Sequence, residues 1–185
     1  LIEKNNFDYI IFQDRSHNPI RQLDSTMFYA KKFIRLSKSK KSIPFLFSTW
    51  FYQRYWEQKY PDNKIDLIKN PYPIESVISR ISNQENVDFI PVGRAFEFFQ
   101  RRHPDYNLLF DDDKHPSPNG TYLAACVIFA KISGESTVGL PSRFFEYNEE
   151  ENKWIYFNIV DNNFAALSQK ISDEIVFSDI PDHSH

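Results

Sequence analysis

The chain alternates between short apolar runs and longer segments whose apolar residues recur at helical spacing. Three short runs are rich in aromatic and β-branched residues, which is typical of buried strands. They cover residues 7–12, 43–47 and 87–92. Pro91 argues against a strand at the end of the third run, because proline lacks the N–H that a strand interior requires. The pattern therefore predicts three strands separated by helical segments.

The helical segments show apolar residues three and four positions apart, as one buried helix face requires. A helix is expected over residues 25–36 with Asp24 or Ser25 as its N-cap, and a shorter one over 95–102. A last helix is expected around residues 164–175. The periodic positions in these long segments are Met27, Ala30, Phe33 and Ile34; Ile74, Val77, Ile78 and Ile81; and Phe164, Leu167, Ile171 and Ile175.

One further segment, residues 117–133, is apolar on nearly every side, which predicts a buried helix. Ser117 suits its N-cap, Pro118 its first helical position and Gly134 the residue just past its end. Residues 148–153 are strongly polar and are expected to form an exposed loop.

Strands that alternate with helices indicate parallel βαβ units in a layered α/β fold. In such folds ligands bind beyond the carboxyl ends of the strands. Gln13, Trp50 and Arg94 follow the three predicted strands, so we expect them near that edge. Arg94 is a candidate substrate-binding residue, although a structural ion pair is an equally good interpretation. The aromatic residues 50–56 could form a platform for a ligand, but a segment of the core and its rim is the more common use of such a stretch.

Length, charge and cysteine content narrow the possibilities further. A chain of 185 residues can bury the core of one domain, and residues 1–185 are interpreted as a single domain. The net charge of −3 argues against a general nucleic-acid binder. No apolar run approaches the ~20 residues of a membrane helix. Cys126 lies in an apolar run, so it is interpreted as a packing residue.

Asp112 and His115 are the residues best suited to catalysis. Histidine titrates nearest neutrality and serves as a general base when a carboxylate orients its ring. The alternative is that Asp111, Asp112 and Asp113 form a solvated acidic turn. His103, Asp105 and this turn do not show the tight spacing of metal ligands, so neither a metal nor another cofactor is expected. His17 is expected in a surface loop, and His183 and His185 in a polar tail.

The stretch Asp112-x-x-His115-Pro-Ser-Pro-x-Gly, followed by Thr-Tyr-Leu-Ala-Ala-Cys, resembles the C-terminal catalytic block of the SGNH (GDSL-type) hydrolases. It is especially similar to a bacterial branch whose block reads Asp-x-x-His-Pro-Ser-x-x-Gly-x-Tyr-Leu-Ala-Ala-Cys. Residues 8–16, 48–50 and 90–96 also agree with that branch, in the same order. This resemblance implies a flavodoxin-like, three-layer α/β/α sandwich with a mostly parallel central sheet.

The resemblance also implies roles for single residues. A serine of an N-terminal Gly-Asp-Ser motif would attack an acyl ester, with His115 as the base and Asp112 as its orienting partner. Gln13 stands where the family places Gly-x-Asn-Asp, so it is the candidate side-chain donor of the oxyanion hole. Trp50 lies in the matching stretch 48–50, and the same resemblance makes it the candidate for substrate binding. Losing one such donor typically costs ~3 kcal/mol of transition-state stabilisation.

The chain departs from the family in having no Gly-Asp-Ser. We therefore expect the first strand and the serine block to precede Leu1, which leaves this domain N-terminally incomplete. The leading hypothesis is an ester hydrolase of the acetylesterase type acting on small-molecule or carbohydrate esters. The alternatives are a binding protein that keeps the fold without turnover, and a metal-dependent hydrolase that uses residues 111–115.

Overall fold

The computed structural model describes residues 5–178, so His183 and His185 lie outside the described residues. The chain forms two compact units, which meet in sequence between Arg94 and Ala95. Within the described residues there are seven helices and five strands, and the helices lie in both units. The predicted mixed α/β class is confirmed. No helix within residues 5–178 is long and apolar enough to cross a membrane.

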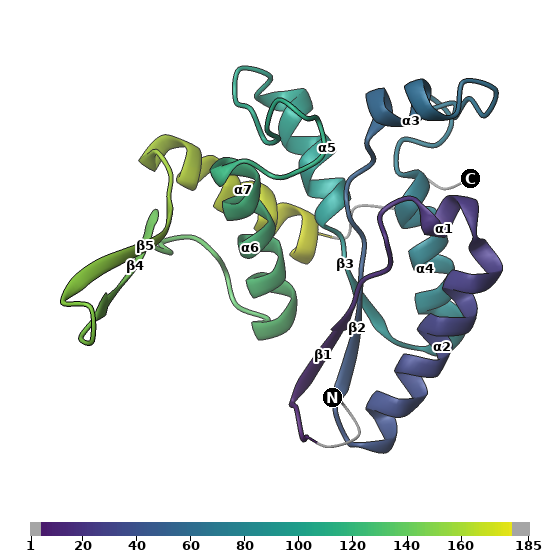
Figure 1. Ribbon diagram of the computed structural model, residues 1–185, viewed down its shortest axis with the longest axis horizontal. Helices are drawn as coiled ribbons and strands as arrows, with labels where there is room; N and C mark the ends of the chain where they lie inside the picture. The colour runs from purple at the N-terminus through teal and green to yellow at the C-terminus, as the bar shows by residue number, and fades with distance from the viewer. Residues whose placement is uncertain (1–4, 179–185) are drawn as a thin grey trace. The chain divides into compact units, whose positions relative to one another are not determined.

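The first unit contains a three-stranded parallel sheet with the order β1-β2-β3 (Figure 1). The strands are β1 (Tyr9–Phe12), β2 (Ile43–Phe47) and β3 (Asp88–Ile90). The three predicted strands and their parallel pairing are therefore confirmed. The third strand is shorter than predicted, since it ends before Pro91, and α5 (Val92–Arg102) begins almost at once.

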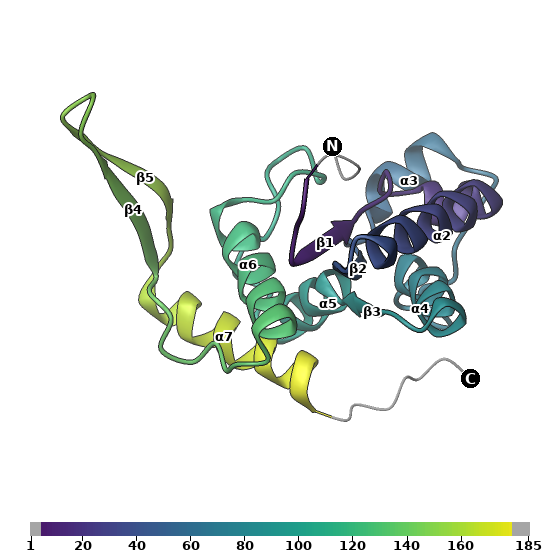
Figure 2. The ribbon, with the colours of Figure 1, turned by 90° about the horizontal axis from the view of Figure 1, so that it is seen from below.

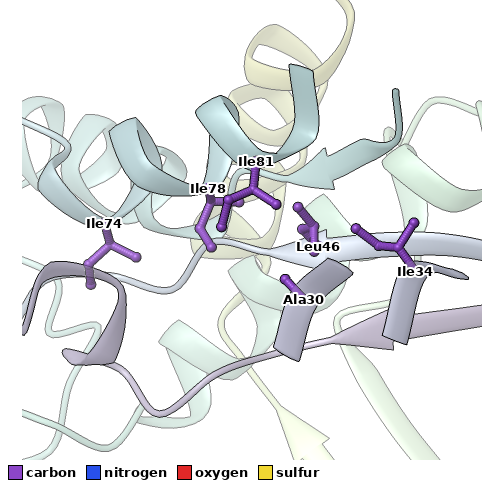
Figure 3. Packing of buried hydrophobic residues seen from close by; sticks show 6 residues of the cluster. All are labelled: Ala30, Ile34, Leu46, Ile74, Ile78 and Ile81. Atoms are coloured by element: carbon purple, nitrogen blue, oxygen red, sulfur yellow. The ribbon is translucent and has the colours of Figure 1, made fainter. Parts of the chain in front are cut away.

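Helices α2 (Leu23–Ser39) and α4 (Pro73–Glu85) pack on the sheet. The single turn of α1 (Asn18–Arg21) precedes α2 in the chain and contacts both helices. Figure 3 shows their apolar side chains gathered around a residue of β2. These buried side chains, which the helical periodicity identified, are Ala30, Ile34, Ile74, Ile78 and Ile81, packed with Leu46. Burying one such isoleucine stabilises the fold by ~2 kcal/mol.

The start of α2 differs from the prediction. Gln22 is the N-cap residue and its side chain makes no capping hydrogen bond, while Asp24 and Ser25 lie inside the first turn. The predicted cap at Asp24 or Ser25 is wrong. The helix extends to Leu23 because α1 runs almost directly into it, and the Thr26 N–H donates to the Gln22 carbonyl at 2.9 Å.

The second unit is built on α6 (Pro118–Ser133) and α7 (Asn162–Phe177), which pack against each other. The Ser117 cap and the left-handed Gly134 are confirmed. The prediction that α6 is buried all round is wrong, because Ala125 is exposed and the fully buried residues lie on one face. The opposite face carries small or partly covered side chains.

An antiparallel hairpin between α6 and α7 was not predicted. It consists of β4 (Arg143–Asn148) and β5 (Lys153–Ile159), and its turn is the loop predicted at residues 148–153. Figures 1 and 2 show the ribbon extending away from α6 and α7. Its aromatic side chains are exposed on both faces. The strands therefore lack the alternation of apolar and polar residues by which a half-buried strand is recognised in a sequence.

Candidate active site

The loop that leads into α6 is held by hydrogen bonds to its own backbone. The Ser117 N–H donates to the Leu108 carbonyl at 2.9 Å, and the Phe110 N–H donates to the His115 carbonyl at 2.9 Å. The Ser117 hydroxyl donates to the Asn107 carbonyl at 2.8 Å and accepts the Gly120 N–H at 3.3 Å. These bonds place Asp112 and His115 in a defined turn at the N-terminal end of the helix.

Gly120 is required by packing in this loop. A Cβ atom at Gly120 would lie 2.1 Å from the Leu108 carbonyl oxygen, which is closer than real Cβ contacts allow. The glycine of the block quoted above therefore lets the loop backbone lie directly against α6. Its role is to position the turn.

Asp112 and His115 contact each other as the spacing suggested. His115 Nδ1 lies 2.5 Å from Asp112 Oδ2, while Asp112 Oδ1 accepts the backbone N–H groups of Lys114 and His115 at 2.9 and 3.0 Å. Both side chains are accessible, with 75% of His115 and 45% of Asp112 exposed. The carboxylate thus occupies one ring nitrogen and leaves Nε2 for another partner.

The environment of Asp112 favours its ionised form. The hydrogen bond from His115, followed by the two backbone N–H groups, lowers the pKa of the Asp112 carboxyl to about 2. Asp112 is therefore a carboxylate at neutral pH, as an orienting partner for histidine must be. The left-handed backbone of Asp113, with φ of 56°, completes the turn that brings the two side chains together.

The carboxyl ends of the strands in the first unit carry the other predicted site residues. Gln13 directly follows β1 and is exposed, while Trp50 follows β2 and is half-buried against Tyr52, with ring centroids 6.2 Å apart. Gly93 packs on the backbone beyond β2, where a Cβ would lie 2.3 Å from the Thr49 carbonyl oxygen. Because the Gln13 side chain is exposed, its amide is accessible.

Arg94 is engaged in an ion pair in this structure. Its Nε donates to Glu75 Oε1 at 2.7 Å, its Nη2 contacts the same oxygen, and its guanidinium carbon lies 5.6 Å from the Tyr72 ring centroid. The side chains are 15% and 5% exposed for Arg94 and Glu75 respectively. Of the two interpretations given for Arg94, the structural ion pair is the one formed here.

Two serines, Ser16 and Ser48, lie close to the carboxyl ends of β1 and β2, and Ser25 follows Asp24 in the stretch of the sequence that is most similar to Gly-Asp-Ser. Ser48 is fully buried, and the Ser16 hydroxyl is hydrogen-bonded to the Tyr52 hydroxyl at 2.9 Å. Ser25 lies exposed within α2. Within residues 5–178, none of these three serines is hydrogen-bonded to a histidine that could activate it.

His17 lies in an environment that the sequence did not predict. It is buried among four aromatic rings, with centroid distances of 5.0 Å to Tyr52, 5.2 Å to Trp56, 5.5 Å to Tyr55 and 5.6 Å to Phe51. The predicted surface position is wrong because α3 (Gln53–Lys59) folds its aromatic face over α1. The dense aromatic composition of residues 50–56 was the available signal.

No group of three or more His, Cys, Asp and Glu side chains within residues 5–178 is arranged to hold a metal ion. The Asp112 carboxylate is already committed to His115 and to the two backbone N–H groups. Among the predicted site residues, the structure brings Asp112 and His115 together in the second unit. Gln13, Trp50 and Arg94 belong to the first unit, where they follow neighbouring strands.

Comparison with known proteins identifies the fold. No protein-family model and no curated protein matches the sequence. A DUF4886 family protein from Bacteroides uniformis superposes with a TM-score of 0.65 at 17% identity, covering 95% of this chain and 65% of that one. A "putative SGNH hydrolase from Slackia heliotrinireducens" superposes with a TM-score of 0.52 at 19% identity, covering 69% of this chain and 66% of that one.

These two likenesses show that the chain has an α/β fold similar to SGNH hydrolase-like folds. The chain spans slightly less than two thirds of the length of either protein. Because the identities are below one fifth, the comparison concerns the fold, and function is argued from the site.

Proposed function

We propose that this chain is part of an ester hydrolase in which Asp112 and His115 form the acid–base pair. The observation that carries the proposal is the 2.5 Å contact between His115 Nδ1 and Asp112 Oδ2, with the His115 ring otherwise exposed. A carboxylate on Nδ1 selects the tautomer whose Nε2 can accept a proton. The likeness of fold to an SGNH-type protein supports the same chemistry at a coarse level.

The reaction proceeds through an acyl-enzyme. A serine hydroxyl attacks the acyl carbonyl while His115 Nε2 takes its proton, and Asp112 stabilises the imidazolium that forms. The proton then passes to the leaving alcohol, and His115 activates a water molecule that releases the acid. Since Ser16 and Ser48 are bonded or buried, we propose that the serine lies in sequence outside residues 1–185.

Roles are also proposed for two residues of the first unit. The exposed Gln13 amide is the proposed side-chain donor to the oxyanion, and Trp50 is the proposed contact for the substrate. Small acyl groups such as acetyl, on small molecules or on carbohydrates, are the proposed substrates. Arg94 is not proposed to bind the substrate, because Glu75 already neutralises its charge.

Hydrolysis of p-nitrophenyl acetate by the protein expressed from its full reading frame tests the proposal. His115→Ala and Asp112→Asn are each expected to lower kcat/KM by a factor of ~10²–10⁴, the usual contribution of acid–base catalysis. Asp111→Asn is the matched control, because this neighbouring carboxylate is exposed and the carboxylate bonded to the His115 ring is that of Asp112. Full activity of His115→Ala would refute the assignment of the base.

Labelling with a fluorophosphonate probe, followed by mass spectrometry, identifies the nucleophile. The proposal expects one labelled serine, no labelling after denaturation, and hydrolysis that resists a metal chelator. A full-length protein that neither hydrolyses esters nor takes the label would instead be a binding protein that retains the fold. Activity abolished by the chelator and restored by a divalent metal would favour the metal-dependent alternative.

A further inference from the structure

The hairpin of β4 and β5 presents one face of aromatic rings to solvent. In the register of the two strands Phe145 lies opposite Tyr156, and Tyr147 lies opposite Trp154. Residues two positions apart along a strand point to the same side, so these four side chains share one face, which we call the aromatic face. Their exposed fractions are 50% for Phe145, 59% for Tyr156, 41% for Tyr147 and 55% for Trp154.

The opposite face of the hairpin is the one that contacts the helices of its unit. The Asn158 amide donates to the Pro118 carbonyl, at the start of α6, at 2.9 Å, and the Phe144 ring centroid lies 6.2 Å from that of Tyr122. Phe144 and Asn158 are opposite each other in the register, and Phe144 directly precedes Phe145, so both project away from the aromatic face. Helix α6 therefore supports the hairpin from behind, and the hairpin extends away from it (Figure 2).

The rings of the aromatic face are tilted against one another. The Trp154 ring centroid lies 5.2 Å from those of Phe145 and Tyr147, with interplanar angles of 80° and 60°, and Phe145 lies 5.8 Å from Tyr156 at 51°. A flat ligand would meet ring edges as well as ring faces, so it could not stack on the whole surface. A second set of tilted rings can interdigitate with this one, because aromatic pairs prefer edge-to-face and offset geometries.

The area of the aromatic face suits an interface between two protein molecules. An aromatic side chain has ~200 Å² to bury, and roughly half of each ring is exposed, which gives about 400 Å² of open ring surface. A standard interface buries ~800 Å² on each partner, somewhat more than half of it apolar. The four rings thus supply most of the apolar area that such an interface needs. A two-stranded hairpin is also only marginally stable alone, so it gains from a second layer packed on its face.

The charges at the two ends of the hairpin favour a second copy of this chain as the partner. The turn carries the exposed Glu149 and Glu150, whereas the exposed Arg143 lies at the other end, two positions before Phe145 and so on the same side. When two copies pack face to face with antiparallel hairpins, the acidic turn of each meets Arg143 of the other. The same acidic turn disfavours nucleic acids and anionic membranes, which are both negatively charged.

We propose that two copies of this chain dimerise through their aromatic faces, with the hairpins antiparallel about a twofold axis. The rings of the two copies interdigitate at the centre, and Glu149 and Glu150 of each copy pair with Arg143 of the other at the two ends. The proposal goes beyond ester hydrolysis and does not rest on it, because dimerisation requires neither His115 nor a nucleophile.

Sedimentation equilibrium of the full-length protein at increasing concentration provides the test. A dimer with a micromolar or lower Kd is expected, since interfaces of this size bind with micromolar to picomolar affinity. Trp154→Ser should raise the Kd by ~100-fold or more, because a central aromatic anchor is lost from both copies. Phe28→Ser is the matched control and should leave the Kd unchanged, since Phe28 is 63% exposed but lies on α2, outside the hairpin.

Reversing the charges tests the antiparallel arrangement. Arg143→Glu should raise the Kd by ~10-fold or more, because like charges then meet at both ends of the interface. Combining it with Glu149→Arg and Glu150→Arg should restore the affinity, a rescue that a misfolded hairpin could not show.

Three results would each overturn the proposal. The first is a protein that stays monomeric at ~200 μM, well above the micromolar Kd expected for this interface. In that case a shift of the Trp154 emission by phosphatidylcholine vesicles would assign the aromatic face to a membrane surface instead. The second is a dimer that Trp154→Ser leaves unchanged. The third is a triple charge variant that binds no more tightly than Arg143→Glu.

Discussion

Replacing Arg94 by glutamine tests whether this residue holds the fold or is free to bind a substrate. The structure pairs Arg94 with Glu75, and only 5% of the Glu75 side chain is exposed. Arg94→Gln would leave the Glu75 carboxylate buried beside an amide. Removing one partner of a buried pair costs ~3–5 kcal/mol, mostly because the remaining charge stays desolvated. With 15% of Arg94 exposed, we expect the lower end of this range, about 3 kcal/mol.

Urea unfolding followed by tryptophan fluorescence measures this cost, because Trp50 and Trp56 lie in the same unit as the ion pair. In thermal melts, about 3 kcal/mol corresponds to a decrease in Tm of ~6–12 °C for a chain of this size. The double variant Glu75→Gln/Arg94→Gln should lose less stability than the sum of the two single variants, since each single variant leaves one buried charge unpaired and the double variant leaves none.

Arg101→Gln is the surface control. Arg101 pairs with Glu97 across one helical turn, and these side chains are 58% and 44% exposed, so its loss should cost ~0.5 kcal/mol or less. If Arg94→Gln were no more destabilising than Arg101→Gln, the structural role of Arg94 would be refuted. Its guanidinium would then be available for a substrate carboxylate.

Three further predictions concern the second unit. Gly120→Ala should destabilise the protein by ~1–3 kcal/mol in a thermal melt despite the better helix propensity of alanine, because its Cβ would meet the Leu108 carbonyl; a stabilised variant would contradict this packing. The Asp112 carboxyl should titrate near pH 2 by ¹³C NMR, and its pKa should rise toward 3.8 in His115→Ala. Because the folded-state pKa is lowered, the contribution of Asp112 to stability is complete above about pH 4 and is lost as the pH falls toward 2. A pKa of Asp112 near 3.8 in the unmodified protein would argue against its hydrogen bond with His115. Burial raises the pKa of the Cys126 thiol to about 12, so a disulfide reagent at neutral pH should react only after unfolding; rapid reaction of the native protein would show that the thiol is accessible.

Local sequence patterns predicted the elements whose buried face repeats regularly. The apolar positions of α2 and α4 recur at helical spacing because both helices pack one face on the sheet. The contact between Asp112 and His115 was also predictable, since two residues three positions apart in a turn can reach each other without help from the rest of the chain. Ser117 and Gly134 are likewise local signals, and both cap α6 as expected.

The tertiary structure alone decided the features that depend on distant residues. His17 is polar and lies in a loop, yet the aromatic face of α3 buries it. Arg94 became a structural residue only because α4 places Glu75 beside it, nineteen positions away in sequence. The exposed hairpin left no periodic pattern, since it buries neither face. Periodicity records burial along one element, whereas these features arise where separate elements meet.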